Sequence, residues 1–423
     1  MYIYFRDYLY HRVMAFLAAL WFGFPSRKLT VVGVTGTKGK STVVELVAYI
    51  LEYAGKKTVV SSSVRNMDSG MTMPGRFFLQ RLLCQGVCRG CTHAVLEVTS
   101  QGVLQSRHRF INWSIAALTN LQPEHIEAHG GFENYRAAKG SFFQYVAQRA
   151  HRKAQPSLAS YGGQAQSVHH YPVFVINKDD PNAEYFTNLL KSDFNRLRMF
   201  EKSDAESNLI GEFNKYNVGC ALAITDALGI SPDIARQAVA QFPGVLGRME
   251  FIQKEPFAVV VDYAVTPDSL RNVYETLAKR KAQSAKLLCV FGCTGGGRDM
   301  WKRGVMGQIA AEYCDEIILT DDDSYDEKPL SIMNEIESGF LQSAHLRSAS
   351  FGGQANRKSQ SVFKIIDRKE AIRKAIELAR PGDVVVITGK GGDYWLRKAH
   401  GEKIPWSDQQ TVRDSIKQIA NRK

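Results

Sequence analysis

The sequence has few cysteines, and they do not form a disulfide framework. Seven cysteines are spread over 423 residues, and a sparse, odd-numbered set is typical of a reducing compartment, so we expect a cytoplasmic protein. Cys84, Cys88 and Cys91 precede His93. This cluster has two interpretations, a zinc site or free thiols at the end of a helix. The irregular spacing and the lack of a second pair nearby favour free thiols.

Long hydrophobic runs are also lacking. The apolar segment at residues 13–24 is too short to span a bilayer, and no small-residue cleavage site follows it. We predict a helix that ends near Pro25 and packs on a core, with no stable membrane span and no signal peptide. A helix lying in a membrane interface is the alternative, because basic residues flank the segment: His11, Arg12, Arg27 and Lys28.

Charge is not concentrated in any one block. The formal net charge is +12, but Lys and Arg are distributed along the whole chain. Such a balance suits anionic small substrates as well as nucleic acid, and without a basic block we expect no nucleic-acid partner. The chain is 44% hydrophobic and 23% charged, which is ordinary for a globular protein with a sizeable core. The sequence makes no prediction of oligomeric state.

Strand-like apolar runs alternate with helical patterns along most of the chain. Residues 29–36 are predicted to form a buried strand, and residues 41–55 a helix closed by Gly55. The alternation resumes after "FPGVLGRME", residues 242–250. This pattern predicts an α/β fold with mainly parallel sheets covered on both faces.

The same alternation predicts the domain organisation. We expect an N-terminal helix or extension at 1–30, a first α/β domain at 31–243 and a second at 244–423. Two inserts of similar Gly/Gln/Ser content, at 157–167 and 348–361, are predicted to be surface loops, and no function follows from their likeness.

A glycine-rich stretch, "VVGVTGTKGKST" at residues 31–42, combines a strand, a tight turn and a helix N-terminus. In this arrangement backbone N–H groups and the helix dipole face phosphates, Lys40 adds positive charge and Ser41 can ligate magnesium. The common nucleotide-binding motif has a glycine where Val34 stands, so this stretch departs from that motif at one position. Magnesium needs further ligands. Glu97 ends one predicted strand and His125 comes after another, which predicts that they lie beside the phosphates.

Further motifs follow in order along the chain: "LEVTSQGV", "TNLQPEHIEAHG", "YRAAKGSFF", "INKDDP", "GEFNKYN", "GRME", "DYAVTPDSL", "FGCTGGGRD", "ILTDDD" and "ITGKGGD". With these, residues 31–423 resemble the Mur ligase family, and most of all its MurE branch, the UDP-N-acetylmuramoyl-tripeptide synthetases. "GVTGTKGKST" resembles the phosphate loop of that family, whose shorter form explains the absent glycine.

The resemblance implies a central P-loop ATPase-type domain with a parallel sheet and a Rossmann-like C-terminal domain that binds an amino acid. It implies an ATP-dependent ligase of peptidoglycan precursor synthesis that joins a free amino acid to a UDP-muramoyl-peptide-like acceptor. In the family the acceptor carboxylate attacks the γ-phosphate to give an acyl phosphate, and the incoming amine then displaces phosphate. Such chemistry needs charge neutralisation more than a protein nucleophile.

The resemblance also implies residue roles. Asn217 would lie on the adenine side of ATP, Asp262 on the ribose side, and Arg248 at the phosphates. Lys139 matches the lysine that carbon dioxide carboxylates, although its position alone would suggest a solvated helix residue. The implied ATP-binding residues are Gly36, Thr37, Gly39, Lys40, Ser41, Thr42, Asn217, Arg248 and Asp262. The implied ligands of two magnesium ions are Ser41, Glu97, His125 and Lys139, and the implied catalytic residues are Lys40, Lys139 and Arg248.

Substrate contacts are implied in both domains. Arg107 suits an anionic diphosphate. The implied substrate-binding residues are Thr72, Ser100, Gln105, Arg107, Asp322, Lys390 and Asp393.

The sequence departs from the family at several places. Only about 30 residues precede the first strand, too few for the N-terminal domain that binds the uridine end in MurE proteins. Gln101 and Val265 stand where the family has histidines. From Asp321 the chain reads "DDDSYDE", without the arginine of the diaminopimelate-selecting pattern. Diaminopimelate is therefore not supported by the sequence, and lysine or another amino acid remains open.

Two alternatives to this function remain. One is a related ligase with another acceptor, such as a folylpolyglutamate synthase-like or MurT-like enzyme, although the "HIEAHG" stretch and the single cysteine cluster fit these poorly. The other is a non-catalytic ATP-binding paralogue, which the lost histidines motivate and the retained phosphate and metal residues disfavour.

Overall fold

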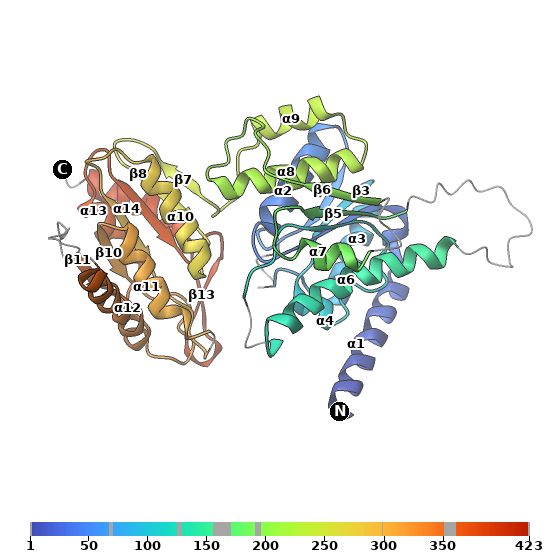
Figure 1. Ribbon diagram of the computed structural model, residues 1–423, viewed down its shortest axis with the longest axis horizontal. Coiled ribbons are helices and arrows are strands. Elements are labelled where there is room, and N and C mark those ends of the chain that lie inside the picture. Colours follow the sequence, from blue (N-terminus) through green and yellow to red (C-terminus); the bar gives the residue numbers. More distant parts are fainter. Residues whose placement is uncertain are drawn as a thin grey trace, which may run out of the picture. The chain divides into compact units, whose positions relative to one another are not determined.

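The computed structural model describes residues 2–66, 71–124, 129–154, 171–190, 196–297, 299–350 and 361–421. The chain divides into two compact units (Figure 1). The first comprises Met1–Leu209 with Phe213–Pro243, and the second comprises Ile210–Glu212 with Gly244–Lys423.

The first unit contains a six-stranded sheet in the order β2-β3-β1-β4-β5-β6, and every neighbouring pair of strands is parallel. Successive side chains of a strand point to opposite faces of a sheet, and successive residues of these strands are buried, so both faces are covered. The strands are β1 (Thr30–Thr35), β2 (Thr58–Ser61), β3 (His93–Glu97), β4 (Trp113–Leu118), β5 (Val173–Asn177) and β6 (Leu197–Phe200).

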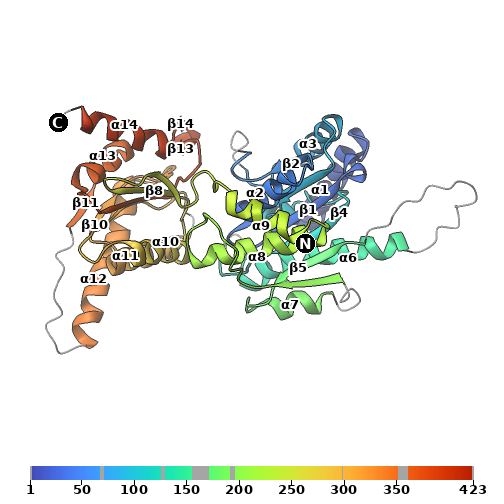
Figure 2. The ribbon, with the colours of Figure 1, turned by 90° about the horizontal axis from the view of Figure 1, so that it is seen from above.

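Helices cover this sheet, as the two ribbon views show (Figures 1 and 2). On one face Leu83 of α3, Phe142 of α6 and Phe186 of α7 join the strand residues in one apolar cluster. The helices are α1 (Tyr2–Trp21), η1 (Pro25–Lys28), α2 (Lys40–Tyr53), α3 (Arg76–Cys88), α4 (Ser100–Leu104), α6 (Phe132–Ala154), α7 (Ala183–Asn188), α8 (Glu212–Ala227) and α9 (Pro232–Gln241).

The parallel arrangement determines where the candidate site lies. β1 lies between β3 and β4, so the ends of these three strands, at Thr35, Glu97 and Leu118, meet at one edge of the sheet. The glycine loop and the "TNLQ" stretch leave this edge, and Glu97 ends β3 there. In α/β proteins, ligands bind beside the carboxyl ends of the strands, at the point where the strand order reverses.

The N-terminal apolar segment forms α1, which confirms the predicted helix. Its alanines Ala15, Ala18 and Ala19 are buried, and the helix packs against α3. Among the described residues, no helix is long and apolar enough to cross a membrane.

The second unit contains a mixed six-stranded sheet in the order β11-β10-β9-β12-β8-β7. The neighbouring strands are parallel except β7, which runs antiparallel to β8 at the sheet edge. The strands are β7 (Glu250–Gln253), β8 (Ala258–Asp262), β9 (Leu287–Phe291), β10 (Glu316–Leu319), β11 (Ser361–Lys364) and β12 (Val384–Thr388), with a hairpin of β13 (Trp395–Arg397) and β14 (Lys403–Pro405).

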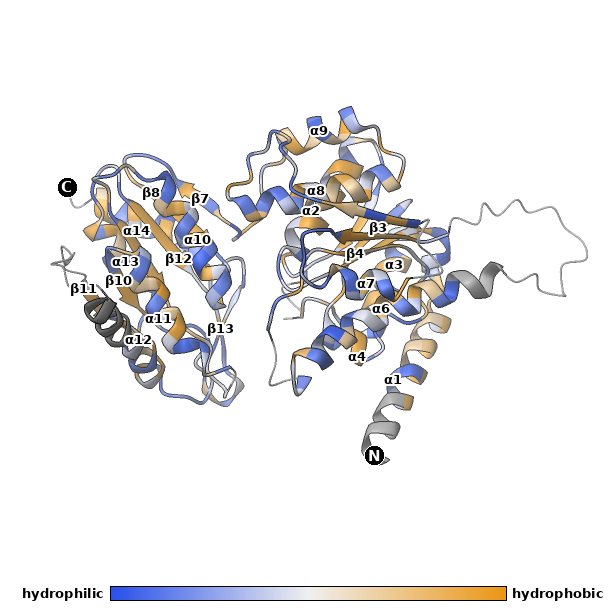
Figure 3. Ribbon diagram, viewed as in Figure 1, coloured by the Kyte–Doolittle hydropathy of each residue, from blue (hydrophilic) through white to orange (hydrophobic). Residues whose placement is uncertain are grey.

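The helices of the second unit follow the sequence signals for helix starts. Thr266 and Ser269 form a capping box around Pro267 at the start of α10. Figure 3 shows hydrophobic strands inside both units. The helices are α10 (Pro267–Arg280), α11 (Lys302–Tyr313), α12 (Pro329–Ser350), α13 (Arg368–Leu378), η4 (Ala399–Gly401) and α14 (Asp408–Ala420).

The predicted α/β class with parallel sheets is therefore confirmed. The two similar inserts are a different matter, since 157–167 and residues 351–360 of the second insert lie outside the described residues.

Candidate active site

The glycine loop joins β1 to α2 in a conformation that only glycine adopts without strain. Gly39 has a φ of 79°, and a Cβ atom there would lie 2.1 Å from Oδ1 of Asn217. A Cβ atom on Gly36 would lie 1.9 Å from Oγ1 of Thr119. Both glycines therefore permit close approach of neighbouring groups. The predicted adenine-side residue Asn217 lies beside the loop, and its Nδ2 donates to Oδ1 of Asn214 at 2.7 Å.

The segment that follows β4 holds this loop in place. The backbone N–H of Thr37 donates to the Asn120 carbonyl at 2.9 Å, and the N–H of Lys38 donates to Asn120 Oδ1 at 2.9 Å. Thr119 Oγ1 donates to the Lys38 carbonyl at 2.6 Å. The sequence reasoning did not assign Thr119 or Asn120, although their position directly after a strand of the same sheet was a usable signal.

Two lysines meet at one backbone carbonyl. Lys40 Nζ donates to the carbonyls of Gly36, at 3.0 Å, and Thr37, at 2.9 Å. Lys139 Nζ donates to the same Gly36 carbonyl at 2.8 Å. This arrangement concentrates positive charge at the loop, where phosphates are expected.

Lys139 is buried, so the solvated position that its sequence context alone would suggest is wrong. Its exposed fraction is 1%, and Nζ lies 4.7 Å from the centroid of the Tyr135 ring. Burial lowers the pKa of Lys139 well below its ordinary value, and the charge of Lys40 lowers it further. The amine is therefore biased toward its neutral, nucleophilic form.

Ser41 and Glu97 are linked through Ser63. The hydroxyls of Ser41 and Ser63 lie 2.7 Å apart, and the backbone N–H of Ser63 donates to Glu97 Oε1 at 2.7 Å. Glu97 is buried. A hydroxyl and a carboxylate are oxygen ligands of the kind that magnesium prefers, so these residues fit the ion that the resemblance implies. Sequence reasoning missed Ser63, which follows β2 at the same edge of the sheet.

The other candidate metal-binding groups are His125 and the cysteine cluster at residues 84–91. His125 lies outside the described residues. Within the part of the chain that the structure describes, no group of three or more His, Cys, Asp or Glu side chains could hold a metal ion. Ser41 and Glu97 supply two oxygen atoms, so a magnesium ion there would need further ligands from the nucleotide, water or the other predicted residues. Cys84, Cys88 and Cys91 form no disulfide bond among the described residues.

The predicted acceptor-side residues of the first unit form a second cluster. Nε of Arg107 donates to the side chain of Gln105 at 3.0 Å, and its Nη1 donates to the Met73 carbonyl, next to Thr72. Arg76 donates to the Gln105 carbonyl at 2.7 Å. These contacts bring two guanidinium groups together at the start of α3, a suitable place for an anionic substrate.

Ser100 lies apart from that cluster in these contacts. Its Oγ lies 3.1 Å from Nε2 of His129, and the His129 ring packs edge-on against Tyr135 at 5.2 Å. Tyr135 Oη in turn lies 3.2 Å from Oγ1 of Thr37. Ser100 is thereby connected to the glycine loop rather than to Arg107.

In the second unit, Asp262 and Arg248 occupy neighbouring segments. The Asp262 carboxylate accepts the backbone N–H groups of Met249, at 2.7 Å, and Ala264, at 2.8 Å. The Arg248 guanidinium lies 4.2 Å from the centroid of the Tyr263 ring. Asp262 thus holds the "GRME" and "DYA" segments together. Its contact with a ribose and the contact of Arg248 with phosphates stay predictions.

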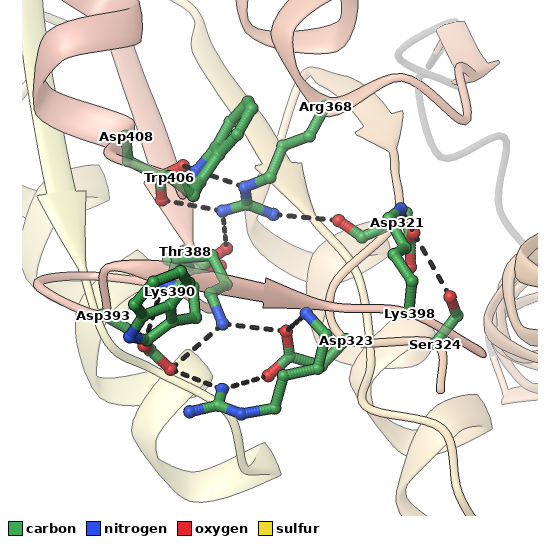
Figure 4. A network of polar contacts seen from close by, with 12 residues as sticks. Asp321, Asp323, Ser324, Arg368, Thr388, Lys390, Asp393, Lys398, Trp406 and Asp408 are labelled. Atoms are coloured by element: carbon green, nitrogen blue, oxygen red, sulfur yellow. Dashed lines mark hydrogen bonds and ion pairs between the residues drawn. The ribbon is translucent and has the colours of Figure 1, made fainter. Parts of the chain in front are cut away.

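The predicted amino-acid-binding residues belong to a dense polar network (Figure 4). Lys390 Nζ donates to Asp323 at 2.9 Å and to Asp393 at 3.1 Å. Arg397 pairs with the same two carboxylates at 2.8 Å and 2.7 Å. Sequence reasoning chose Lys390 and Asp393 but missed Asp323 and Arg397. Arg397 has no family motif around it, so only the fold identifies it.

Asp322 is buried behind this network. Burial raises its pKa to about 6, and the positive charges of Lys390 and Arg368 oppose that rise. Arg368 forms a two-point salt bridge with Asp408, at 2.9 and 2.8 Å, and both side chains are fully buried (Figure 4). The strand ends at Thr320 and Thr388 are therefore surrounded by fixed charges of both signs.

Comparisons with known proteins agree with this geometry. The Mur ligase middle domain matches residues 34–225, and the Mur ligase glutamate ligase domain matches residues 247–391. A relative from Geobacillus kaustophilus, UDP-N-acetylmuramoyl-L-alanyl-D-glutamate–2,6-diaminopimelate ligase, is 32% identical over 96% of this chain and 83% of its own length.

Solved structures give the same result. A structure of a UDP-N-acetylmuramoyl-L-alanyl-D-glutamate–2,6-diaminopimelate ligase aligns with a TM-score of 0.57 and 26% identity, over 93% of this chain and 79% of that one. Mycobacterium tuberculosis folylpolyglutamate synthase, complexed with ADP and AMPPCP, shares the fold with a TM-score of 0.64, at 15% identity over 89% of this chain and 92% of that one. The domain matches and the full-length relative together establish that the chain belongs to the Mur ligase family.

Proposed function

We propose that this Mur ligase adds one amino acid to the peptide carboxylate of a UDP-muramoyl-peptide acceptor, in the cytoplasm, as a step of peptidoglycan precursor synthesis. The observation that carries the proposal is the meeting of Lys40 and Lys139 at the Gly36 carbonyl, next to the Ser41–Ser63–Glu97 chain. All seven cysteines are free thiols, which suits a reducing compartment.

The glycine loop would bind the β- and γ-phosphates of ATP through its backbone N–H groups, with Lys40 turning from the loop carbonyls to the phosphate oxygens. An acceptor carboxylate oxygen attacks the γ-phosphorus, ADP leaves, and an acyl phosphate forms. The amine of the incoming amino acid then attacks the acyl carbon, loses a proton, and expels inorganic phosphate. The protein supplies orientation and positive charge rather than a covalent nucleophile.

Magnesium would be held by Ser41 and Glu97, with His125 and Lys139 as the further predicted ligands, and would neutralise charge on the transferring phosphoryl group. For Lys139 the proposal includes carboxylation. A neutral amine attacks carbon dioxide and releases a proton, which leaves a carbamate anion opposite the Lys40 ammonium. The lowered pKa of buried Lys139 supports this reaction.

The amino-acid substrate is inferred from the polar network of the second unit. The relatives are named for 2,6-diaminopimelate. In this chain Arg397, which shares its carboxylate partners with the predicted residue Lys390, already pairs with Asp323 and Asp393. A distal carboxylate would have to displace one of these partners, so we propose an amino acid other than diaminopimelate, selected by Asp322, Lys390 and Asp393.

Phosphate release from ATP tests the function directly. The purified chain is incubated with magnesium, UDP-muramoyl-dipeptide and each amino acid of a panel that includes lysine and diaminopimelate, and the product is identified by mass spectrometry. Release that requires both substrates supports the proposal and names the amino acid. ATP binding without release under any pairing would instead support another acceptor or a non-catalytic role.

A further inference from the structure

Helix α1 places its large apolar side chains outward and small ones inward. Ala15, Ala18 and Ala19 are at most 2% exposed, while the large apolar side chains of the opposite face are 42% to 80% exposed. A helix that only completes a core buries its largest side chains instead. The outward residues are Leu9, Tyr10, Val13, Phe16, Leu17, Leu20 and Trp21.

The outward residues lie on one face of the helix. Positions 9, 13, 16, 17 and 20 recur at spacings of three and four, which align side chains along an α-helix. Tyr10 and Trp21 lie beside this row. The residues from 9 to 20 extend over about 18 Å of helix. A continuous exposed apolar surface of this length marks an interaction site.

The segments around α1 contain many more basic than acidic residues. Asp7 is the acidic residue of α1, and no Asp or Glu occurs in residues 8–44, 71–96 or 98–123. α3 packs against α1 and η1. It carries exposed Arg81 and is followed by exposed Arg89, and η1 carries exposed Arg27 and Lys28.

Positive charges also lie close to the helix itself. Arg109 lies near enough to Arg12 for its charge to lower the Arg12 pKa, after the larger effect of burial. Phe16 packs edge-on against Phe110, with ring centroids 5.4 Å apart. The segment that supports the apolar face is therefore itself basic.

We propose that α1 docks the chain on an anionic lipid bilayer. The helix lies in the interface, with its apolar row in the acyl region and Arg27 and Lys28 among the headgroups. Charge complementarity favours a bilayer over a second copy of the chain, because pairing two copies through this face brings two cationic surrounds together. Anionic headgroups supply the opposite charge.

Vesicle flotation with the full chain tests the proposal. We expect flotation with vesicles containing about one-third phosphatidylglycerol, weaker flotation with pure phosphatidylcholine, and a loss of the difference at high salt. Emission of Trp21, isolated by comparison with Trp21→Phe, should shift to shorter wavelength with the anionic vesicles.

Two sets of variants separate the apolar and charge contributions. Replacing Leu17 and Leu20 together by Glu should weaken binding roughly a hundredfold. The matched control, Ile234→Glu on α9, replaces an apolar side chain that is 38% exposed in the same unit and should leave binding unchanged. Replacing Arg27 and Lys28 by Gln should weaken binding to anionic vesicles about fivefold per charge, and leave the helix intact.

Three results would overturn the proposal. The first is that the unmodified chain binds neither kind of vesicle. The second is that the Leu17 and Leu20 replacements leave flotation unchanged. The third is that the chain forms a dimer that these replacements abolish, while vesicles have no effect. Circular dichroism checks that each variant is folded, so this test does not depend on the ligase assay.

Discussion

Lys40 and Lys139 donate hydrogen bonds to the same carbonyl oxygen, that of Gly36. One lysine opens a helix directly after the glycine loop, and the other lies in α6, almost a hundred residues later in the chain. Two ammonium groups at one carbonyl repel each other, and burial disfavours the charge on Lys139 in particular. The site is therefore prepared for a change at Lys139, either loss of its proton or conversion to an anion.

Replacing Lys139 by Ala should abolish ligation more than nucleotide binding. We expect kcat to fall by about 10²–10³-fold, because the group that supports the transferring phosphoryl is lost, with a much smaller change in the Kd of ATP. Lys178→Ala is the control, since Lys178 is exposed and pairs with Glu201 on the surface. Equal turnover in the two variants would remove Lys139 from the mechanism.

The proposed carboxylation of Lys139 predicts a signature of its own. With ¹³C-labelled bicarbonate, the unmodified chain should show a carbamate carbon resonance that Lys139→Ala lacks, and removal of carbon dioxide should lower turnover reversibly. A resonance that persists in Lys139→Ala would belong to another lysine and would contradict the assignment.

Replacing Gly39 by Ala should be more damaging than the same change at Gly55. Both glycines have a positive φ, 79° and 75°, so both variants suffer backbone strain of about 1–2 kcal/mol. Only at Gly39 would the new Cβ meet Asn217, at 2.1 Å, whereas nothing lies within 4 Å at Gly55.

Thermal unfolding and ATP titration measure the difference. Displacement of Asn217 should lower the free energy of unfolding of Gly39→Ala by roughly 1–2 kcal/mol more. The variant should also bind ATP more weakly. The double variant Gly39→Ala with Asn217→Ala should recover part of the loss in stability. No recovery would mean that the backbone strain, and not the contact with Asn217, dominates.

The sequence supported the fold and the nucleotide side of the site better than the amino-acid side. The alternation of strands and helices is a local signal, and parallel strands bring their ends together, so Lys40, Ser41 and Glu97 could be placed before the structure was known. Their partners Ser63, Thr119 and Asn120 form no such pattern. They matter because the fold brings three strand ends to one edge.

In the second unit, the family resemblance pointed to Lys390 and Asp393 but not to the residues that pair with them. Asp323 and Arg397 are separated by more than seventy residues in the chain. Their pairing depends on the position of the β13–β14 hairpin, which no periodicity specifies. For Lys139 the local pattern was misleading. A helical pattern alone suggested a solvated position, but tertiary packing buries the side chain.

His108 should make the first unit less stable in acid. Burial, with the charges of Arg109 and Arg12, lowers its pKa to about 3, while the unfolded chain titrates near 6.5. Between these values the unfolded state binds more protons than the folded state, so stability falls as pH decreases from about 7 toward 3. At pH 5, this effect of His108 lowers the free energy of unfolding by about 2 kcal/mol.

The variant His108→Phe tests this contribution. The ring packs edge-on against Tyr145 and Phe142, with centroids 4.9 Å and 6.1 Å away, so a phenyl ring should fit. Its unfolding free energy should change less between pH 7 and pH 5 than that of the unmodified chain. His400→Phe, at an exposed position, should keep the original pH dependence. If the free energies of unfolding of His108→Phe and the unmodified chain changed equally with pH, His108 would not be the cause of the acid sensitivity.

The buried salt bridge between Arg368 and Asp408 provides the sharpest test of stability in the second unit. Both side chains are at most 1% exposed, Arg368 also donates to the Thr388 carbonyl at 2.8 Å, and Trp406 donates to Asp408 at 2.8 Å. Asp408→Ala leaves a buried guanidinium without its carboxylate, so we expect a loss of about 3–5 kcal/mol in the free energy of unfolding.

A double variant separates the pair from the cost of an unpaired charge. Arg368→Met with Asp408→Leu removes both charges and should cost clearly less than Asp408→Ala alone, because no uncompensated ion remains. Glu370→Ala breaks the exposed pair with Arg373 on the same helix, and it should cost at most about 1 kcal/mol. Denaturant unfolding measures all three variants. A double variant as unstable as Asp408→Ala would show that Arg368 stabilises the strand end at Thr388 through its carbonyl contact rather than through its charge.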